Sequence, residues 1–282
     1  MNIEISSLSY TYNPGSPNAV TALLEINLYI PSGQNLGLLG ATGSGKSTLV
    51  QHLNGLHSPQ NGTIKFDDYE ISKNKNLPRA IRQKIGLVFQ FAEFGFFEET
   101  VFDEVAFSPR QWGWSEDRTR ELTMQVLQQI GFPIDIARTR SPFQLSGGQQ
   151  RMVAMASVLV MQPEVLILDE PTVGLDAPTR ARIKGIIQSQ RREDCTVIII
   201  SHDMDFVASL ADRVVIMKIG AIHYDGSTAE VLSNQDLLRQ AGLEPPAAIR
   251  YRSRLLNLGI SESPELLDLY KIKSMIRGRS GG

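Results

Sequence analysis

The sequence predicts an α/β protein: a mainly parallel sheet wrapped by helices, with an N-terminal antiparallel β subdomain, a helical insertion and a small C-terminal helical appendage. Short apolar runs alternate with helical patterns along the chain, which is typical of parallel strands joined by crossover helices. A glycine-rich turn also stands between the first such run and a helical pattern, as at the phosphate site of many α/β sheets. The predicted strands of the main sheet are 36–39, 85–89, 165–168, 197–200 and 214–217.

Two segments ahead of that turn, 3–12 and 24–30, alternate apolar and polar residues. A stretch rich in Pro, Gly and Asn at 13–18 lies between them. This pattern predicts an antiparallel pair of strands, which forms the N-terminal β subdomain.

Residues 40–47 match the phosphate-loop pattern G-x-x-x-x-G-K-[ST]. The fold is therefore predicted to be that of a P-loop NTPase. The backbone amides of such a loop close round a triphosphate, Lys46 reaches its β- and γ-phosphates, and the Ser47 hydroxyl binds Mg²⁺. The predicted nucleotide-binding residues of this segment are Gly40, Ala41, Thr42, Gly43, Ser44, Gly45, Lys46, Ser47 and Thr48.

Polar side chains follow three of the other predicted strands, at the edge where open α/β sheets bind ligands. Asp169 and Glu170 follow one strand, His202 follows the next and Gln90 follows an earlier one. We expect Asp169 to hold Mg²⁺, directly or through water, and Glu170 to polarise an attacking water. We expect His202 to contact the γ-phosphate or that water, and Gln90 to ligate Mg²⁺ or orient water. The predicted catalytic residues are Glu170, His202 and Gln90, and the predicted metal ligands are Ser47, Gln90 and Asp169.

A second anion site is predicted at residues 145–149, where a helical pattern spanning 149–161 begins. A serine hydroxyl and side-chain-free glycine amides suit an anion at a helix N-terminus. Lys46 and its loop already fill the local phosphate role, and this second segment lies at the far end of an insertion of about fifty residues. The segment is therefore expected to serve the nucleotide of an opposing subunit, so that the chain works as half of a dimer. Its residues are Leu145, Ser146, Gly147, Gly148 and Gln149.

The insertion lies between 90 and 144, where helical patterns with polar turns replace strands, including a helix at 116–131. Helical patterns also continue from residue 228 onward. We expect a nucleotide-binding domain over 1–230, with a helical subdomain at about 91–160. A C-terminal helical appendage is expected over 231–282, with a disordered tail at 278–282.

Composition narrows the classes of partner. The net charge of −2 and the pI near 6.1 give no basic field for a nucleic-acid backbone, which argues against nucleic acid. The single cysteine, Cys195, excludes an internal disulfide framework, favours a reducing compartment and is expected to serve packing. No apolar run approaches the roughly twenty residues that span a bilayer, so a membrane role is expected to come through a partner.

The phosphate loop, Gln90, residues 145–149, the Asp169-Glu170 strand, Gly174-Leu175-Asp176 and His202 follow one another in this order. In this order they resemble the nucleotide-binding subunit of an ABC transporter, over about residues 1–230. The resemblance implies that the nucleotide is ATP, that Tyr12 stacks on adenine and that Asp176 lies at the dimer contact. It also implies that residues 145–149, here called the signature segment, close over the γ-phosphate of ATP held by the other subunit. Tyr10 shares the alternation of Tyr12 and remains an alternative for the stacking residue.

Four further segments, 51–55, 97–101, 141–145 and 241–246, are similar to the ATPase subunits of energy-coupling factor transporters, especially the second member of the ATPase pair. The resemblance to that family implies an ABC importer for a vitamin or a transition-metal ion. It places the chain as a peripheral protein on the cytoplasmic face of the cell membrane. The implied partners are a second ATPase subunit, a transmembrane coupling subunit and a small substrate-binding membrane subunit. Both a homodimer and a heterodimer of ATPases remain open, and the resemblance to one member of a pair favours the heterodimer.

Five of the eleven Phe residues fall within residues 89–97, beside Gln90. They form either a core for the helical insertion or a partly exposed apolar groove that accepts a helix of the membrane subunit. Within this stretch, Phe91-Ala92-Glu93 departs from the family's usual Phe-Pro-Glu, which affects the expected partner contact and not the phosphate chemistry.

Two other functions fit the sequence less well than a transport ATPase. A soluble ABC ATPase acting on nucleic acid or ribosomes is disfavoured by the charge and by the absence of a coiled-coil repeat. A nucleotide-binding regulator without turnover is disfavoured because every predicted catalytic position carries a suitable residue.

Overall fold

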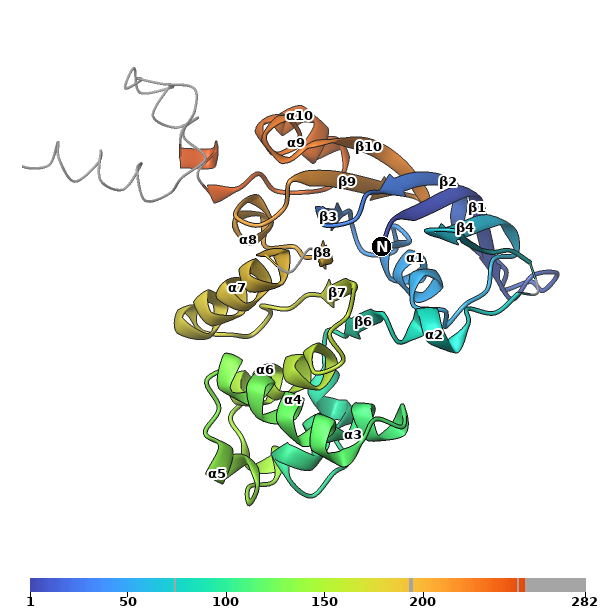
Figure 1. Cartoon of the computed structure of the whole chain (residues 1–282). Coiled ribbons are helices and arrows are strands. Elements are labelled where there is room, and N and C mark those ends of the chain that lie inside the picture. The colour runs from blue at the N-terminus through green and yellow to red at the C-terminus, as the bar shows by residue number, and fades with distance from the viewer. Residues whose placement is uncertain (74, 193–194, 248, 252–282) are drawn as a thin grey trace, which may run out of the picture.

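The structure is a computed structural model that describes residues 1–73, 75–192, 195–247 and 249–251. Its strands form a six-stranded central sheet and a four-stranded antiparallel sheet, as the predicted fold class requires. Figure 1 shows the antiparallel sheet (blue to cyan) beside α1 (Lys46–Leu53) and the helical insertion (green) extending from the end of the molecule where β6 and β7 lie. Within the described ranges, no helix is both long and apolar enough to cross a lipid bilayer.

The central sheet contains every main-sheet strand that the sequence predicts. Neighbouring strands from β9 to β6 run parallel, and β10 pairs antiparallel with β9 at one edge. Because parallel strands end at the same edge, the residues that follow β3, β6, β7 and β8 meet there. In spatial order the strands are β10 (Ala221–Ser227), β9 (Arg213–Lys218), β3 (Asn35–Leu39), β8 (Thr196–Ile200), β7 (Val165–Asp169) and β6 (Ile85–Val88).

The antiparallel sheet contains the predicted N-terminal pair and two further strands. The predicted pairing of the first two strands is confirmed, although the second begins earlier, at Val20. Three strands were not predicted: β4, β5 and β10. β5 has only three residues and β10 has no buried residue, so neither carries the apolar run that marks a core strand. The sheet order is β2 (Val20–Ile30), β1 (Ile3–Tyr12), β4 (Asn61–Phe66) and β5 (Tyr69–Ile71).

The central sheet is buried on both faces, because alternate residues of its strands join two separate cores. On one face, Leu36 and Leu38 of β3 pack with α1 and the antiparallel sheet. On the other face, Leu166 and Leu168 of β7 pack with α6 (Gly147–Leu159), α7 (Ala177–Arg192) and α8 (Met204–Ala208). This arrangement explains why the sequence shows continuous apolar runs. Cys195 lies buried in the second core, in agreement with its expected packing role.

The helical insertion follows β6 and returns to the sheet through α6. The predicted helix at 116–131 is α4, and α6 begins two residues before its predicted start because Ser146 caps it at Gly147. A Cβ atom on Gly86 of β6 would lie 2.4 Å from Val158 of α6, so the close contact between this helix and the sheet requires glycine. The insertion comprises η1 (Ala92–Gly95), α3 (Val101–Gln111), α4 (Glu116–Gln129), α5 (Ile134–Ala137), η2 (Pro142–Gln144) and α6. Ahead of β6 lies α2 (Arg79–Arg82).

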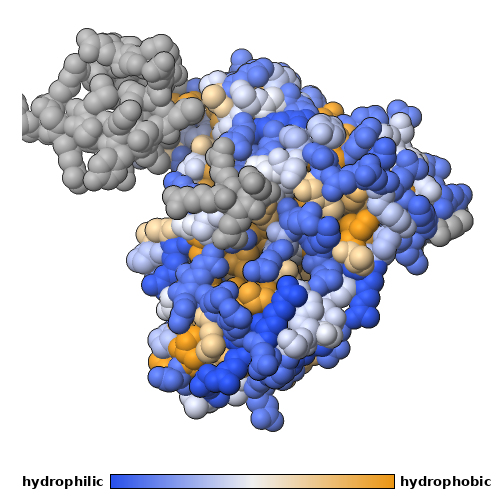
Figure 2. Space-filling model, viewed as in Figure 1, coloured by the Kyte–Doolittle hydropathy of each residue, from blue (hydrophilic) through white to orange (hydrophobic). Residues whose placement is uncertain are grey.

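The first part of the expected C-terminal appendage consists of α9 (Thr228–Ser233) and α10 (Gln235–Gln240). Val231, Leu232 and Leu238 of these helices are fully buried and belong to the same core as α6 and α7. These helices therefore share a core with the elements that precede them. The tail at 278–282 lies outside the described residues. The face seen in Figure 2 is mostly hydrophilic, and apolar residues form a few separate patches on it.

Candidate functional site

One cavity of about 430 Å³ at the ligand edge of the central sheet joins residues from widely separated segments. We call it the P-loop cavity. Residues 42–48 of the phosphate loop line it together with Gln90, Asp169, Glu170 and His202. Each predicted strand-end group therefore lies beside the phosphate loop. Gly40 and Ala41 stand just behind the lining and contact it through Lys46.

The phosphate loop is held in a conformation that requires glycine. At Gly45 the φ angle is 103°, and a Cβ atom there would lie 2.5 Å from the carbonyl oxygen of Ala22. The Nζ atom of Lys46 donates hydrogen bonds to the carbonyl oxygens of Gly40 and Ala41, at 2.7 and 3.0 Å. The ammonium group is thus already held against the loop that would receive a phosphate.

Opposite charges face each other inside the P-loop cavity. Burial lowers the pKa of Lys46, and the carboxylates of Glu170 and Asp169 oppose that effect. Burial raises the pKa of Asp169, and the positive charge of Lys46 opposes that effect. A cavity that holds both signs of charge suits an anionic ligand bound together with a cation.

Glu170 is fixed by the segment that carries His202. Its Oε1 accepts a hydrogen bond from the backbone amide of His202 at 3.0 Å, and its Oε2 accepts one from the Ser201 hydroxyl at 3.3 Å. The imidazole Nε2 of His202 lies 3.5 Å from Oε1. The backbone of Glu170 is left-handed, with φ 49°, which is uncommon outside glycine and recurs at functional sites. Burial raises the pKa of Glu170, a change that suits a general base.

Arg151 connects α6 to the end of β6 and is not among the residues predicted from the sequence. The guanidinium is buried and donates hydrogen bonds to the carbonyl oxygens of Phe89 (3.0 Å) and Gln90. Arg151 is the only charged residue of α6, and that is the signal that could have marked it, because arginine is rarely buried without partners. The backbone of Gln90 is thereby tied to the helix that begins with the signature segment.

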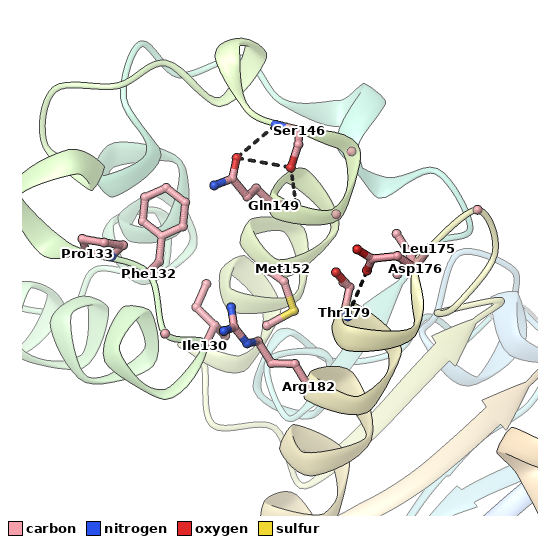
Figure 3. A pocket seen from close by; sticks show the side chains of 14 residues that line it. Ile130, Phe132, Pro133, Ser146, Gln149, Met152, Leu175, Asp176, Thr179 and Arg182 are labelled. Carbon is pink, nitrogen blue, oxygen red and sulfur yellow. Dashed lines mark hydrogen bonds between the residues drawn. The ribbon is translucent and has the colours of Figure 1, made fainter.

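Residues 146–149 of the signature segment line a different cavity of about 390 Å³, here called the signature cavity, whereas Leu145 is buried. Figure 3 shows Ser146 and Gln149 at the start of α6, facing Asp176 and Thr179 across it. Ser146 Oγ accepts a hydrogen bond from the Gln149 amide, and Gln149 Oε1 accepts one from the Ser146 amide at 3.1 Å. This capping box orders the helix start. The residues that line the signature cavity and those that line the P-loop cavity do not overlap.

Asp176 and the start of α7 lie against the signature segment. Asp176 Oδ1 accepts a hydrogen bond from the Thr179 amide at 3.0 Å, and hydrogen bonds from Thr179 hold the pKa of Asp176 below its ordinary value. A Cβ atom on Gly148 would lie 3.1 Å from Thr179 Oγ1, so α7 packs directly on the signature glycine. On the other side, Arg180 forms an ion pair with Asp203, the residue after His202, at 3.1 Å. The first turn of α7 therefore contacts both the signature segment and the His202 segment.

Tyr12 lines the P-loop cavity, whereas Tyr10 is absent from the described lining. The two rings pack edge to face, with centroids 5.0 Å apart. The position of Tyr12 favours it over Tyr10 as the residue that meets a base.

The residues proposed for Mg²⁺ supply oxygen donors that suit a hard cation. The hydroxyl of Ser47, the carboxylate of Asp169 and the amide of Gln90 line the same cavity, beside the phosphate loop. The donor set therefore fits Mg²⁺ bound together with a polyphosphate.

The Phe cluster at 89–97 is divided between core and surface. Phe96 is buried, whereas the other four are between 46% and 83% exposed. Phe91 stacks on Phe94 with ring centroids 5.6 Å apart, and Phe97 packs against Phe107. The exposed members are Phe89, Phe91, Phe94 and Phe97; we call them the Phe surface.

Residues 23–173 match the family model described as ABC transporter. The energy-coupling factor transporter ATP-binding protein EcfA2 of Symbiobacterium thermophilum is 42% identical over 100% of this chain and 98% of its own. The EcfA2 protein of Clostridium perfringens is 41% identical over 98% of this chain and 97% of its own.

Solved structures show the same fold. The protein cbiO1 of Clostridium perfringens, part of the ABC transporter complex cbiONQ, superposes with a TM-score of 0.73 and 33% identity, over 90% of this chain and 98% of its own. The ATP-binding cassette MJ0796, solved as a dimer in a post-hydrolysis state with ADP and Pi, superposes with a TM-score of 0.70 and 27% identity, over 80% of this chain and 98% of its own.

Proposed function

The chain belongs to the ABC transporter family and, within it, to the ATP-binding proteins of energy-coupling factor transporters, and from this premise we propose how its two cavities act. It is an ATPase. ATP binds in the P-loop cavity with its triphosphate on residues 40–48 and its adenine on Tyr12. Lys46 contacts the β- and γ-phosphates. Ser47, Gln90 and Asp169 hold Mg²⁺, which neutralises phosphate charge.

Glu170 acts as the general base for hydrolysis. Its carboxylate is held by the His202 amide and the Ser201 hydroxyl, so it is oriented before a nucleotide binds. Burial raises its pKa, and a carboxylate with a higher pKa is a stronger proton acceptor. His202 lies 3.5 Å from the same carboxylate and contacts the γ-phosphate or the attacking water. Gln90 orients that water or binds the metal ion.

The observation that carries the proposal is the separation of the two cavities. The signature segment lines one and the phosphate loop lines the other, with no lining residue in common. The signature segment of one ATPase therefore completes the site of another, and Asp176 lies at the contact between them. The similarity to EcfA2 proteins, one kind of chain in a paired system, favours a heterodimer with a second ATPase.

The ATPase pair powers import of a vitamin or a transition-metal ion through membrane partners. We propose that the Phe surface receives a helix of the transmembrane coupling subunit, because exposed aromatic side chains anchor interfaces of this kind. Gln90 lies between Phe89 and Phe91, so nucleotide state and partner position are linked there. A small membrane subunit binds the solute. The chain thus works at the cytoplasmic face of the cell membrane, held by its partners.

ATP-dependent association tests this arrangement. The full chain with Glu170→Gln, which keeps ATP unhydrolysed, is expected to elute as a dimer with ATP, either alone or only with a co-expressed second ATPase. Adding Ser146→Arg fills the signature cavity and is expected to abolish the dimer, while ATP still binds to the monomer. Ser115→Arg, at the exposed cap of α4 in the same subdomain, serves as the matched control and should preserve the dimer. Unchanged association with Ser146→Arg would contradict the proposal.

A further inference from the structure

Four rings gather behind the P-loop cavity, where the end of β1 meets α1. They belong to Tyr10 and Tyr12 of β1, His52 of α1, and His57 of the loop after α1. Tyr12 alone of these four residues lines the P-loop cavity. Tyr10 and His57 pack edge to face against Tyr12, and His52 packs against Tyr10 and His57.

The hydroxyl of Tyr12 is bound on the α1 side by three groups. It lies 3.2 Å from Thr48 Oγ1, 3.3 Å from Gln51 Oε1 and 3.4 Å from His57 Nε2. Thr48 and Gln51 belong to the helix that starts with Lys46. The ring of Tyr12 is thus fixed relative to the same helix that positions the phosphate-binding lysine.

His57 joins the two tyrosines. Its Nε2 faces the Tyr12 hydroxyl and its Nδ1 lies 3.5 Å from the Tyr10 hydroxyl. Its ring stacks on Tyr10, with centroids 5.0 Å apart, and meets Tyr12 edge to face at 5.7 Å. A neutral imidazole has one donor nitrogen and one acceptor nitrogen, so a single ring can serve both hydroxyls.

The same loop also holds the backbone between the two tyrosines. The amide of Thr11 donates to Gln60 Oε1, and Gln60 Nε2 donates to the carbonyl oxygen of Thr11, both at 2.8 Å. The amide of His57 donates to the carbonyl oxygen of Gln51 at 3.0 Å. The loop therefore contacts β1 at two points. Gln60 binds the backbone of Thr11, and His57 contacts the hydroxyls of Tyr10 and Tyr12.

We propose that His57 is a positioning residue for nucleotide binding: it holds the Tyr12 ring in the orientation that receives the purine base. This inference rests on the proposed function of the P-loop cavity. A ring that is already oriented loses less freedom when the base stacks on it, so the affinity for the nucleotide rises. His57 acts through Tyr12 and does not line the cavity itself.

The test compares ATP with inorganic tripolyphosphate, which has no base, in competition binding to the full chain. His57→Leu is expected to weaken ATP binding by about threefold to tenfold, the range for one lost hydrogen bond, and to leave tripolyphosphate binding unchanged. His57→Gln can still offer an amide to Tyr12 and is expected to restore most of the affinity. Ser58→Ala, in the same loop with its hydroxyl on Asn76, is the matched control and should leave ATP binding unchanged.

A double-mutant cycle with Tyr12→Phe identifies the route of the effect. If His57 acts through the Tyr12 hydroxyl, His57→Leu weakens ATP binding by less than about twofold when that hydroxyl is already missing. An undiminished effect in the Tyr12→Phe chain, or equal weakening of tripolyphosphate and ATP, would overturn the inference. Failure of the unmodified chain to bind either probe would instead overturn the proposed function of the cavity.

Discussion

Arg151 of α6 donates a hydrogen bond to the backbone carbonyl oxygen of Gln90, at the end of β6. The same guanidinium donates to the carbonyl oxygen of Phe89 at 3.0 Å. α6 begins with the signature segment, and Gln90 lines the P-loop cavity. Under the proposed function, one side chain therefore joins the helix that serves the partner's nucleotide to a residue that serves the chain's own.

Replacing Arg151 is expected to uncouple the signature segment at the start of α6 from Gln90. Arg151→Met leaves two carbonyl oxygens without their donor, which costs about 1–3 kcal/mol each when they are shielded from water. ATP hydrolysis in the assembled complex should fall by about tenfold or more, with ATP binding to the separate chain nearly unchanged. Arg151→Lys keeps the charge without the planar fork and should be intermediate. Arg120→Met, an exposed change on α4, is the control; equal hydrolysis in the two Met variants would contradict the prediction.

Glu170→Gln is expected to lower ATP hydrolysis by about 10²-fold or more, because the amide cannot accept a proton from water. The change preserves the size of the side chain and an oxygen that can accept from the His202 amide. ATP binding should therefore remain intact. Phosphate release and ATP binding by the same preparation measure the two effects, and near-normal turnover would remove Glu170 from the role of base.

The rate of ATP hydrolysis should fall at low pH. The position of this fall, the acid limb of the pH profile, should follow the raised pKa of Glu170. Burial raises this pKa, and the hydrogen bonds from His202 and Ser201 lower it in part. Only the ionised carboxylate accepts a proton, so the rate rises as the pH rises through that pKa. Ser201→Ala removes one hydrogen bond and should move the limb to higher pH, as measured by kcat against pH. The exposed change Ser233→Ala should leave the limb in place, and a limb that Ser201→Ala does not move would argue against Glu170 as its origin.

The buried side chain of His52 should make the stability of the fold sensitive to acid. It is fully buried, and burial lowers its pKa from 6.5 to about 4. Its Nδ1 lies 2.7 Å from the carbonyl oxygen of Thr48, to which it donates. Its Nε2 has no hydrogen-bond partner among the described residues. The unfolded chain takes up a proton below pH ~6.5 and the folded chain resists it, so stability is complete above that pH and falls as the pH drops toward 4.

The expected loss is up to about 3 kcal/mol across this window. Thermal unfolding between pH 4 and pH 7 measures it in the unmodified chain and in His52→Leu, which lacks the titrating group and should show a flatter dependence. His223→Gln, on the exposed face of β10, is the control and should follow the unmodified chain. Parallel curves for His52→Leu and the unmodified chain would exclude His52 as the cause.

Two truncations separate the core part of the C-terminal region from the rest. Ending the chain after Thr228 removes Val231, Leu232 and Leu238, which are fully buried, and each contributes about 1.5–3 kcal/mol. The shortened chain should unfold at lower temperature and bind ATP poorly. Ending it after Tyr251 keeps every described core residue and should retain both stability and ATP binding. Recovery of the membrane complex with each form then measures what the removed residues add to assembly, and equal stability of both forms would contradict the prediction.

Sequence alone could predict most of the fold and the chemical groups of the P-loop cavity. Both the fold and these groups depend on short patterns. An apolar run indicates a buried strand, and a polar residue just after it lies at the ligand edge of the sheet. The residues that hold these groups were not predictable in the same way. The contact of Arg151 with Gln90 spans 61 positions, and only the packing of α6 against β6 brings them together.

The loop of His57 and Gln60 shows the same limit. A histidine and a glutamine in a polar turn carry no pattern that points to β1, and their partners Tyr12 and Thr11 stand about 45 to 49 positions earlier. The strands β5 and β10 also lack a distinctive pattern, because β5 is three residues long and β10 has no buried residue. Supporting contacts of this kind follow from the folded arrangement.

The separation of the P-loop and signature cavities has a cellular consequence under the proposed arrangement. In the favoured heterodimer, a chain made in excess of its partners holds ATP without consuming it, because its own signature segment cannot reach its own phosphate loop. The rate of ATP turnover in a cell then reports the number of assembled transporters and is insensitive to surplus copies of this subunit. Regulation of uptake can therefore act on the supply of the scarcest partner, with no need for a separate inhibitor of idle subunits.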